Sequence, residues 1–366
     1  MKTMQIVPAM EQGGVERGIV EVNRAIIAEG WENVVVSAGG RLVRDVERDG
    51  GRHVTLDVKS KNPFTYFFRA AKLARLLEAE RPDAVCVHSR VPAWLFVRAN
   101  RRLGIKWISF AHGANSVSAY SRVMTYGDLT VTPSRYIADY LKEHYGIEES
   151  RLRVISRAID PVKFDPSRLD AEFIAQKKHE WGLDGCFTVM GLGRITQLKG
   201  YDTLIRATAL LPERFKTVIV GEAEALRKDV EVSLRSLAAE LGVSGRVVFA
   251  GNQSKVAECI SLADVVVSSN TRKAEAFGRS MAEALAMDRL VVAKAFGGAL
   301  DVVRDGVDGV LVRAEGDAEG VAREFADAVL KVSEMRFSGL RAGALERFDF
   351  DIMLQKSIGV YKELMA

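Results

Sequence analysis

Short apolar runs alternate with longer amphipathic segments along almost the whole chain. Residues 84–88 and 264–268 are typical apolar runs, and each has the length of a buried strand. The segments between such runs place their apolar residues at helical spacing. Strands that alternate with helices form parallel sheets covered by helices on both faces. The pattern therefore predicts an α/β protein with two doubly wound parallel sheets, one in each half of the chain.

The expected strands of the first half span residues 5–9, 33–37, 53–56, 84–88, 107–111, 129–132 and 152–155. Its helices are expected from the glycine pair at 13–14 to about residue 29, and over 42–49, 59–81, 91–103 and 134–144. The expected strands of the second half span 187–190, 217–220, 247–250, 264–268, 290–293 and 309–312. Its helices are expected over 201–210, 226–241, 255–262, 279–287, 301–305, 319–333 and 337–347, and a last amphipathic helix over 351–364.

Two Asp-Pro steps, Asp160-Pro161 and Asp165-Pro166, interrupt the alternation near the middle of the chain. Proline breaks regular elements, so an irregular connection is expected here. A chain of 366 residues is also long enough for two separate cores. We therefore expect an N-terminal domain over residues 1–165 and a C-terminal domain over residues 166–350.

The composition is that of a globular protein, with 48% apolar and 27% charged residues. No apolar run approaches the length of a membrane span, and the first ten residues fit a strand better than a signal peptide. Cys86, Cys186 and Cys259 are far apart and lie in apolar runs, without metal-ligand or Cys-x-x-Cys spacing. They are interpreted as reduced core residues, which indicates a cytoplasmic protein.

The net charge of +4 is unevenly distributed. Residues 1–165 carry 25 Lys and Arg against 19 Asp and Glu, whereas the remainder carries 27 against 29. The basic first half suits an acidic partner or an anionic membrane surface, or is an ordinary solvated surface. Nothing in the sequence indicates a nucleic-acid partner.

The stretch at residues 268–287, SSNTRKAEAFGRSMAEALAM, carries the clearest candidate chemistry. It leaves a strand, passes through a polar loop that contains Glu275, and ends in a helix that contains Glu283. Between the two carboxylates, Phe277-Gly278-Arg279 coincides with the expected helix start, where backbone N–H groups attract anions. Ligands of open α/β sheets bind at the carboxyl ends of the strands. The stretch therefore predicts a site for a molecule with hydroxyl groups at its ends and phosphate in its middle.

Two further strand ends carry glycines that suit phosphate. Gly13-Gly14, between the first strand and the first helix, suits either a close approach of backbone N–H groups to a phosphate or a plain tight turn. Gly193-Arg194 and Lys199 follow the strand at 187–190. An arginine and a lysine there would stabilise the charge that develops on a diphosphate leaving group. The alternative is a pair of solvated surface charges.

His112 follows the strand at 107–111 and precedes a glycine, a position that suits a site residue or an ordinary histidine. Asp349 and Asp351 form an Asp-x-Asp pattern, which binds a divalent ion in some sugar-nucleotide enzymes. Asp351 also fits as the N-terminal cap of the last helix, and no His or Cys spacing suits zinc. We therefore expect no metal site and no cofactor.

Taken together, these motifs resemble the retaining glycosyltransferases of family four, also called glycosyl transferases group 1. The resemblance extends over nearly the whole chain, and its strongest element is Glu275-Ala-Phe-Gly-Arg-Ser-Met-Ala-Glu283, which is similar to the family's E-x7-E signature. It implies the GT-B architecture, in which two Rossmann-like domains face a cleft. It also implies that the final helix, residues 351–366, crosses back onto the N-terminal domain.

The resemblance implies roles for residues of the second half. Glu275 would contact the donor sugar, and Glu283 would contact the ribose hydroxyls of the nucleotide. The backbone amides of Phe277, Gly278 and Arg279 would face the diphosphate. Arg194 and Lys199 match the family's diphosphate-binding arginine and lysine, and Gly193 precedes Arg194. Gly298 and Asp301 fall where the family has a glycine and an acid.

In the first half, the resemblance matches Gly13 and Gly14 to the glycine-rich first loop and His112 to the histidine that lines the donor sugar and the reacting centre. Two segments depart from the pattern. Residues 156–160 lack the proline, asparagine and glycine of the usual interdomain hinge, and Gly221-Glu222-Ala223 replaces a glycine–aspartate–glycine segment. Base and phosphate contacts of that segment are therefore not carried over.

The expected function is transfer of a sugar from a nucleotide diphosphate donor to a glycan or lipid-linked hydroxyl, with the anomeric configuration retained. GGVERG, SKNP at 60–63 and EAFGR are most similar to bacterial enzymes of lipopolysaccharide-core or envelope-glycan synthesis. Two other classes stay open: a GT-B sugar-nucleotide epimerase and a non-catalytic nucleotide-sugar binder.

Residues 59–75 mix basic and aromatic side chains: Lys59, Lys61, Arg69, Lys72 and Arg75 with Phe64, Tyr66, Phe67 and Phe68. This mixture suits a phosphorylated, lipid-linked acceptor at the inner face of the cytoplasmic membrane. The alternative is a helix whose aromatics belong to the core and whose charges are solvated.

Overall fold

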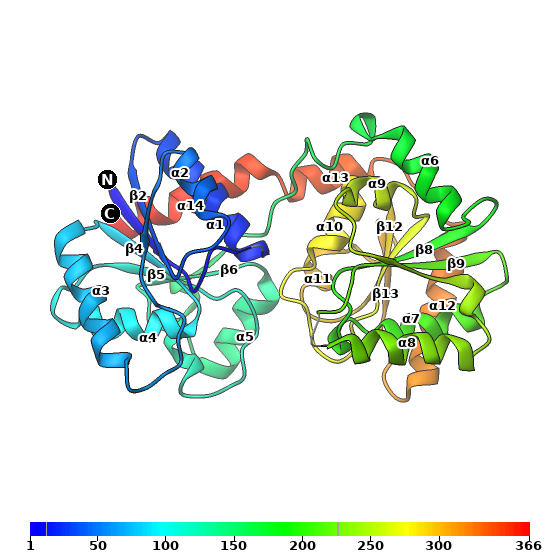
Figure 1. The fold of residues 1–366 in the computed structure, drawn as a ribbon, viewed down its shortest axis with the longest axis horizontal. Helices are drawn as coiled ribbons and strands as arrows, with labels where there is room; N and C mark the ends of the chain where they lie inside the picture. The colour runs from blue at the N-terminus through cyan, green and yellow to red at the C-terminus, as the bar shows by residue number, and fades with distance from the viewer. Residues whose placement is uncertain (12, 225–226) are drawn as a thin grey trace. The chain divides into compact units, whose positions relative to one another are not determined.

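The computed structural model describes residues 1–11, 13–224 and 227–366. These residues form two compact units, an N-terminal unit of Met1–Ser156 with Asp351–Ala366 and a C-terminal unit of Arg157–Phe350. Each unit contains one sheet whose paired strands are all parallel, with helices on both faces of the sheet (Figure 1). The predicted α/β class with two doubly wound parallel sheets is confirmed.

The N-terminal sheet has seven strands in the order β3-β2-β1-β4-β5-β6-β7. In that order the strands are Arg52–Thr55, Glu32–Ser37, Lys2–Ile6, Ala84–His88, Trp107–Phe110, Leu129–Thr132 and Leu152–Val154. The helices of this unit are α1 (Gly14–Ala28), α2 (Val43–Arg48), α3 (Tyr66–Glu80), α4 (Arg90–Ala99), α5 (Arg135–Tyr145) and α14 (Phe350–Met365), with short 3-10 turns at Asn100–Arg102, Ser121–Thr125 and Glu149–Arg151.

The C-terminal sheet has six strands in the order β10-β9-β8-β11-β12-β13. In that order they are Val247–Gly251, Phe215–Val220, Phe187–Leu192, Val265–Ser268, Leu290–Lys294 and Gly309–Val312. The helices are α6 (Ala171–Glu180), α7 (Tyr201–Leu210), α8 (Lys228–Glu240), α9 (Val256–Ser261), α10 (Arg279–Ala286), α11 (Ala299–Val302), α12 (Ala318–Glu334) and α13 (Leu340–Arg347), with 3-10 turns at Pro166–Arg168, Gln197–Lys199 and Ser244–Arg246.

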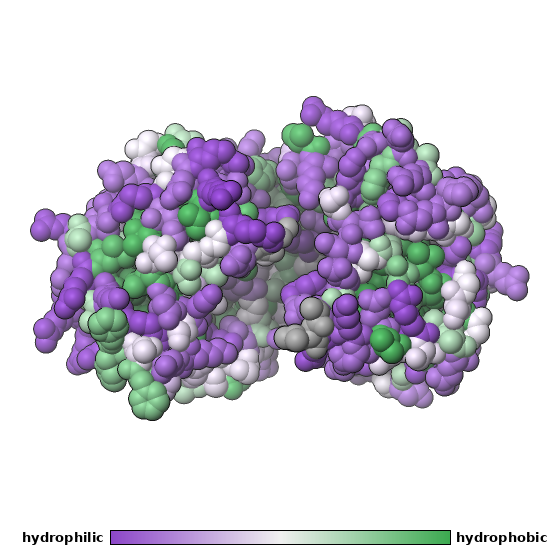
Figure 2. All heavy atoms as spheres, viewed as in Figure 1, coloured by the Kyte–Doolittle hydropathy of each residue, from purple (hydrophilic) through white to green (hydrophobic). Residues whose placement is uncertain are grey.

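The C-terminal core lies on both faces of its sheet, as a sheet of buried parallel strands requires. On one face, Leu204 of α7, Leu234 of α8 and Phe325 of α12 join one hydrophobic cluster. On the other, Ile260 of α9 and Met281 of α10 join a second. On the face of the molecule drawn in Figure 2, hydrophilic residues predominate and hydrophobic ones gather in small areas. Among the described helices, none combines the length and the hydrophobicity that a membrane span requires.

The last helix, α14, belongs to the N-terminal unit, although it follows the C-terminal unit in the sequence. Ile358, Tyr361 and Leu364 of α14 pack with Ile26 of α1 and Ile108 of β5 in one buried cluster. Glu363 forms an ion pair with Arg153, and Lys362 Nζ lies 2.7 Å from Glu29 Oε2. The return of the last helix to the N-terminal unit was expected. It is stabilised by buried hydrophobic contacts and by ion pairs beside them.

The first boundary between the units differs from the predicted one after residue 165, since the C-terminal unit begins at Arg157. The reason is packing: Ile159 and Phe164 are 2% exposed and belong to the C-terminal core. The Ile159 N–H also donates to the Phe348 carbonyl at 3.0 Å. The Asp-Pro steps are thus turns within the C-terminal unit.

Several predicted elements need correction. The helix expected over 59–81 begins only at Tyr66, because Pro63 disfavours helix at Asn62 and the Asn62 side chain accepts instead from the Phe64 N–H at 2.9 Å. Helix α6, which buries no residue completely, was missed because its charged sequence shows no apolar face. Cys186 is only half-buried, unlike the other two cysteines. The predicted start at Leu226 of the helix over 226–241 lies outside the described residues.

Candidate functional site

The C-terminal sheet reverses its strand order between β8 and β11. From β8 the chain builds outward through β9 and β10, and it then returns to place β11 on the other side of β8. Ligand sites of doubly wound sheets form at such a reversal, beyond the carboxyl ends of the strands. The loops that leave β8 and β11 contain Gly193, Arg194, Lys199 and Glu275, so the fold brings these residues to one edge of the sheet.

Lys199 and Glu275 form an ion pair across the reversal. The ammonium group of Lys199 donates to Glu275 Oε1, and the two side chains are 27% and 18% exposed. Partial burial makes the attraction stronger than that of a pair in bulk water. The pair presents a donor that suits a phosphate oxygen next to an acceptor that suits a sugar hydroxyl.

Two hydroxyl groups fix the loop that carries Lys199. The Tyr201 hydroxyl donates to the Gly193 carbonyl at 2.8 Å, and Ser269 Oγ donates to the Lys199 carbonyl at 3.1 Å. Burial and, secondly, the charge of Glu275 raise the pKa of Tyr201, so that its hydroxyl remains a neutral donor. Sequence reasoning assigned no role to either residue, although Tyr201 lies two residues after Lys199 and Ser269 lies within the stretch at residues 268–287.

Helix α10 begins at Gly278 with an uncapped N-terminus. Gly278 has φ 93° and ψ 58°, and no side chain caps the helix. The positive φ favours glycine at this position, and an added Cβ would also lie 2.0 Å from Met281 Cε, the flexible end of that side chain, and 3.3 Å from Glu275 Oε2. Unpaired N–H groups of a first helical turn attract anions. The predicted phosphate-facing backbone thus coincides with a real helix start.

The side chains beside Gly278 have different surroundings. Phe277 is 4% exposed, and its ring meets Phe348 edge-on at 5.3 Å, so its side chain belongs to the core and only its backbone remains for a ligand. Arg279 Nε lies 3.6 Å from Glu283 Oε1 on the next turn of α10. The Glu283 side chain is 17% exposed, which leaves a half-buried carboxylate on the same helix as the uncapped start.

The loop after β12 supports this helix start. The Gly298 N–H donates to the Glu275 carbonyl at 2.8 Å. A Cβ at Gly298 would lie 2.5 Å from Phe277 Cα and 2.6 Å from Phe277 N, so the two backbones touch. This backbone contact and hydrogen bond restrain the position of residues 275–278 relative to the loop after β12. Asp301, the other matched position, lies on α11, which Gly298 precedes directly.

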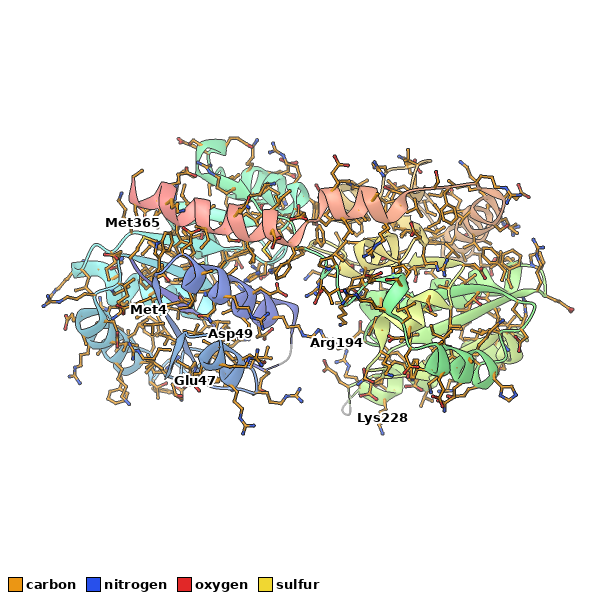
Figure 3. All side chains as sticks on the ribbon, turned by 90° about the horizontal axis from the view of Figure 1, so that it is seen from above. Met4, Glu47, Asp49, Arg194, Lys228 and Met365 are labelled. Carbon is orange, nitrogen blue, oxygen red and sulfur yellow. The ribbon has the colours of Figure 1, made fainter. Side chains whose placement is uncertain are left out.

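Arg194, labelled in Figure 3, has a different partner from Lys199. Its Nη1 lies 2.5 Å from Glu224 Oε1, and the two side chains are 75% and 58% exposed. Glu224 follows Gly221-Glu222-Ala223, the segment that departs from the expected pattern. Exposed ion pairs contribute only about 0–1 kcal/mol, so a bound anion can replace Glu224 at little cost.

Asn270 is a further residue that sequence reasoning missed. It is the second residue after β11 and is 7% exposed. Its Oδ1 atom is buried and accepts no hydrogen bond from the part of the chain that the structure describes. A buried acceptor without a donor is costly in a folded protein. Asn270 therefore joins the candidate residues at this edge.

The N-terminal sheet has its own reversal, between β1 and β4. Gly13 precedes α1 as an N-cap without a side-chain cap, and the Glu16 carboxylate folds back over it: a Cβ at Gly13 would lie 2.1 Å from Glu16 Oε2. Glu16 thus supplies a negative charge at the start of α1, where Gly14 is the first helical residue. A phosphate at this place would compete with that carboxylate.

His112 lies beside a second histidine, which the sequence did not single out. His112 Nε2 and His88 Nδ1 are 2.8 Å apart, and the rings stack at 5.1 Å. His88 ends β4 and is 4% exposed, whereas His112 is half-buried after β5. Since one ring nitrogen must accept, at least one of the two imidazoles is neutral in this arrangement.

The basic and aromatic segment divides between surface and interior. Phe64, Phe67 and Phe68 are 94%, 66% and 61% exposed, so the alternative that placed them in the core is wrong. Arg69, by contrast, is only 5% exposed, and Tyr66 is half-buried. The exposed patch therefore consists of three phenylalanines with lysines beside them, one of which, Lys72, lies 4.5 Å from the Phe68 ring centre.

In the described ranges 1–11, 13–224 and 227–366, no group of three or more His, Cys, Asp or Glu side chains is arranged to hold a metal ion. Asp351 lies in the first turn of α14, and Asp349 precedes that helix.

Two protein families match the two halves of the chain. Residues 12–163 match the family described as Glycosyltransferase Family 4, and residues 175–336 match the family described as Glycosyl transferases group 1. Over 264 residues, which are 69% of this chain, the sequence is 32% identical to the D-inositol 3-phosphate glycosyltransferase of Acidothermus cellulolyticus. That match covers 55% of the relative, and the chain spans about half the length of the curated relatives it matches.

Solved structures show the same fold. A glycosyltransferase from Rickettsia africae ESF-5 has a TM-score of 0.86 and 27% identity, with 100% of this chain and 98% of that chain covered. An Anabaena protein crystallised with UDP and glucose has a TM-score of 0.80 and 19% identity, with 99% and 100% covered. At that identity the second likeness concerns the fold alone.

The contact between Gly298 and Phe277 predicts the effect of one added methyl group. We expect Gly298→Ala to lower the melting temperature and to destabilise the C-terminal unit by about 1–3 kcal/mol, because the methyl group overpacks a backbone contact. Thermal unfolding measures the effect. Gly245→Ala is the matched control, since a Cβ there meets nothing within 4 Å. Equal melting temperatures of the two variants would show that the loop after β12 accommodates the methyl group without loss of stability.

Proposed function

Because the chain belongs to the glycosyl transferases group 1 and shares their two-sheet α/β fold, we propose that it transfers a sugar from a nucleotide diphosphate sugar to a hydroxyl group. The single observation that carries this proposal is the Lys199–Glu275 pair above the uncapped start of α10. Cation, carboxylate and free backbone N–H groups are the groups that a sugar diphosphate needs, and they meet at the strand reversal.

Each part of the donor has a partner at this edge. We assign the diphosphate to Arg194, Lys199 and the backbone of Gly193 and residues 277–279. We assign the donor sugar to Glu275. The ribose hydroxyls fall to Glu283, whose half-buried carboxylate lies farther along α10.

The proposed reaction breaks the bond between the anomeric carbon and the diphosphate oxygen and forms a bond from that carbon to the acceptor oxygen. The acceptor proton passes to the leaving phosphate on the same face, so the configuration is retained. Arg194 and Lys199 stabilise the leaving charge, and they first exchange Glu224 and Glu275 for phosphate oxygens. The family resemblance adds His112, Gly13 and Gly14 of the N-terminal unit as predicted site residues.

Two cations at the diphosphate make a divalent metal unnecessary in this proposal, and no other cofactor is invoked. Metal ions and cationic side chains do the same work there, which is to neutralise the charge that builds on phosphate oxygens.

The proposed acceptor is a glycan or lipid-linked compound of bacterial envelope or lipopolysaccharide-core synthesis, used at the inner face of the cytoplasmic membrane. Support comes from the exposed phenylalanines beside Lys59, Lys61 and Lys72, a mixture that suits an anionic membrane surface. The Acidothermus relative is named for a phosphorylated inositol, which makes a small phosphorylated polyol the main alternative acceptor.

Two rival functions differ in what they need. A sugar-nucleotide epimerase consumes its donor without an acceptor, and a non-catalytic binder retains the donor unchanged. The intact Arg194, Lys199, Glu275 and Glu283 argue against a binder that has lost its catalytic groups, and the need for an acceptor distinguishes transfer from epimerisation.

We expect Arg194→Ala and Lys199→Ala each to lower turnover at saturating donor by on the order of 100-fold, because each removes a charge that stabilises the leaving diphosphate. Steady-state rates over a donor series measure the effect. Arg235→Ala is the matched control: Arg235 is a half-exposed arginine of the same unit that pairs with Glu231 on α8.

Unchanged turnover in both site variants would refute the assignment of the two cations. Activity that disappears in excess chelator and returns with a divalent ion would refute the metal-free part of the proposal.

Product analysis separates the three functions. We expect glycosylated acceptor and free nucleoside diphosphate to appear together, and only when donor and acceptor are both present. The donor is first chosen by thermal shift among UDP-, GDP- and ADP-sugars, because a bound ligand stabilises the fold by mass action. Free nucleotide with an isomerised sugar and no acceptor would favour the epimerase, and an unaltered donor would favour the binder.

The exposed phenylalanines predict membrane binding. We expect sedimentation with vesicles of phosphatidylglycerol and phosphatidylcholine, and a loss of affinity of about tenfold for each of Phe64→Ser and Phe67→Ser, since each removes a large apolar contact. Val232→Ser, which changes a 62%-exposed residue of the C-terminal unit, is the control. If the double variant sediments like the unaltered protein, the patch has another role.

A further inference from the structure

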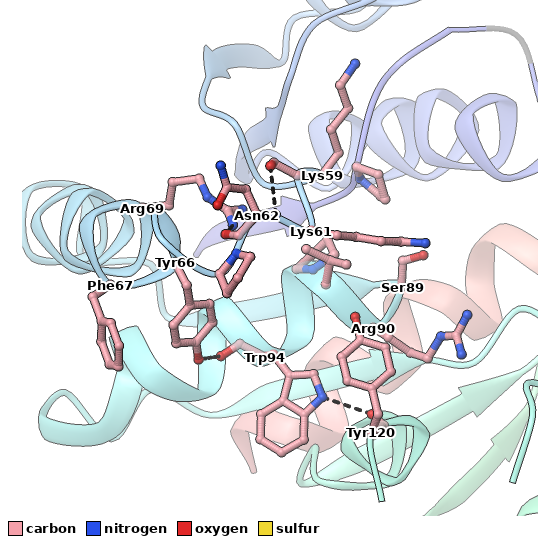
Figure 4. Close-up of a pocket in the computed structure, with 15 residues that line it drawn as sticks. Lys59, Lys61, Asn62, Tyr66, Phe67, Arg69, Ser89, Arg90, Trp94 and Tyr120 are labelled. Carbon is pink, nitrogen blue, oxygen red and sulfur yellow. Dashed lines mark hydrogen bonds between the residues drawn. The ribbon is translucent and has the colours of Figure 1, made fainter. Parts of the chain in front are cut away.

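A pocket of about 830 Å³ lies within the N-terminal unit, at the reversal of its own sheet (Figure 4). Its walls come from the loop after β1, the segment between β3 and α3, the first turn of α3, the start of α4, and the loop after β5. The volume is that of a pocket for a small-molecule ligand. The lining residues that carry the argument are Lys61, Arg69, Ser89, Arg90, Trp94 and Tyr120.

The charged side chains that line this pocket are all positive. Lys59, Lys61, Arg69 and Arg90 line it, and none of the described lining residues is Asp or Glu. A second pocket, of about 720 Å³ in the C-terminal unit, provides the comparison. That pocket has three cations and three carboxylates in its lining, and its Arg272 lies 2.8 Å from Asp202. A concave surface with cations alone concentrates positive potential and attracts anions.

Arg69 is the most unusual of these cations because it is 5% exposed and has no carboxylate partner among the described residues. Its Nε donates to Thr65 Oγ1 at 3.1 Å and its Nη2 to the Asn62 carbonyl at 3.0 Å, while Nη1 is buried without an acceptor. Burying an uncompensated charge is expensive. A ligand anion in the pocket would supply the missing negative charge.

The N-terminus of α4 adds donors to the same place. Ser89 precedes this helix with φ 81° and ψ 154°, and its side chain does not cap the helix. The first-turn N–H groups are therefore available to an anion. Arg90, the first helical residue, donates to Ser121 Oγ at 3.1 Å, and Figure 4 draws its side chain and that of Lys61 extending toward the same side.

An aromatic wall completes the pocket. The rings of Trp94 and Tyr120 stack at 6.3 Å with 16° between their planes, and Trp94 Nε1 donates to the Tyr120 carbonyl at 2.9 Å. Tyr66 donates from its hydroxyl to the Trp94 carbonyl at 2.9 Å, which fixes the wall from the other side (Figure 4). Stacked, partly exposed rings offer a flat apolar surface with polar edges, which suits a ring that carries hydroxyl groups.

We propose that this pocket binds a phosphomonoester carried on a polyhydroxylated ring. The phosphate lies among Lys61, Arg90 and the start of α4, and the ring lies against Trp94 and Tyr120. The buried charge of Arg69 adds to the attraction and holds the loop before α3 through its bonds to Asn62 and Thr65. That this compound is the acceptor of sugar transfer rests on the proposed function, whereas the binding itself does not.

Calorimetric titration of the full chain tests the proposal with glucose 6-phosphate, inorganic phosphate and glucose as probes. We expect glucose 6-phosphate to bind best, inorganic phosphate more weakly, and glucose not measurably. Lys61→Ala and Arg90→Ala are each expected to lower the affinity for glucose 6-phosphate on the order of tenfold to a hundredfold, because each removes a charge-assisted hydrogen bond. Lys61→Arg and Arg90→Lys are expected to restore most of the affinity.

Lys72→Ala is the matched control, since Lys72 lies on α3 outside the lining and faces the Phe68 ring.

Vesicles of phosphatidylcholine with and without phosphatidylinositol 4-phosphate show whether the phosphomonoester can be lipid-borne. Competition with glucose 6-phosphate that depends on Lys61 and Arg90 supports a lipid-borne ligand. The absence of such competition supports a free ligand. Equal binding of glucose and glucose 6-phosphate overturns the proposal. So do unaltered affinities in Lys61→Ala and Arg90→Ala, or an equal loss in Lys72→Ala. Equal affinity for inorganic phosphate overturns the role of the aromatic wall.

UDP affinity in the same variants keeps this proposal separate from the proposed function. We expect it to be unchanged in Lys61→Ala and Arg90→Ala, because neither residue belongs to the C-terminal unit. A chain that binds glucose 6-phosphate through Lys61 and Arg90 but transfers no sugar would refute the function and leave the pocket. A chain that transfers sugar but binds glucose 6-phosphate without needing these residues would refute the pocket and leave the function.

Discussion

The strand order of each parallel sheet reverses at one pair of neighbouring strands, and this reversal determines where both candidate sites lie. Parallel strands end at a common edge, and the helices that follow two neighbouring strands at the reversal leave toward opposite faces. This geometry opens a space that no side chain of the crossover helices fills. In the C-terminal sheet it holds Lys199 and Glu275, and in the N-terminal sheet it holds the cationic pocket around Arg90. Both candidate sites are therefore consequences of topology.

The loops at the C-terminal reversal are positioned by backbone contacts and hydroxyl groups, whereas their charges have exchangeable partners. Gly298 touches the Phe277 backbone, and Tyr201 and Ser269 bond to carbonyl groups. Lys199 and Arg194 instead pair with carboxylates of their own unit. Because the frame does not depend on these ion pairs, a ligand can replace them without loss of the loop structure. The N-terminal pocket differs, since its cations meet no carboxylate in its described lining.

Most strand positions could be predicted closely, because buried parallel strands are near-continuous apolar runs that need no knowledge of the partner strand. The first strand is an exception, since it was expected over residues 5–9 and lies at Lys2–Ile6. Helix α6 could not be predicted, since none of its residues is fully buried and its sequence shows no apolar stripe. The helix expected from residue 59 was too long because basic and aromatic periodicity hid the break at Pro63. The unit boundary moved because Ile159 and Phe164 found their core on the C-terminal side.

Local composition and spacing were enough to predict the α/β class, the alternation of strands and helices, and the motif from Glu275 to Glu283. The pairing of Lys199 with Glu275, the contact of His88 with His112, and the burial of Arg69 without a carboxylate became visible in the folded structure. These facts join residues that are distant along the chain. Burial and partner choice depend on which strand ends become neighbours, and strand order is a property of the folded sheet.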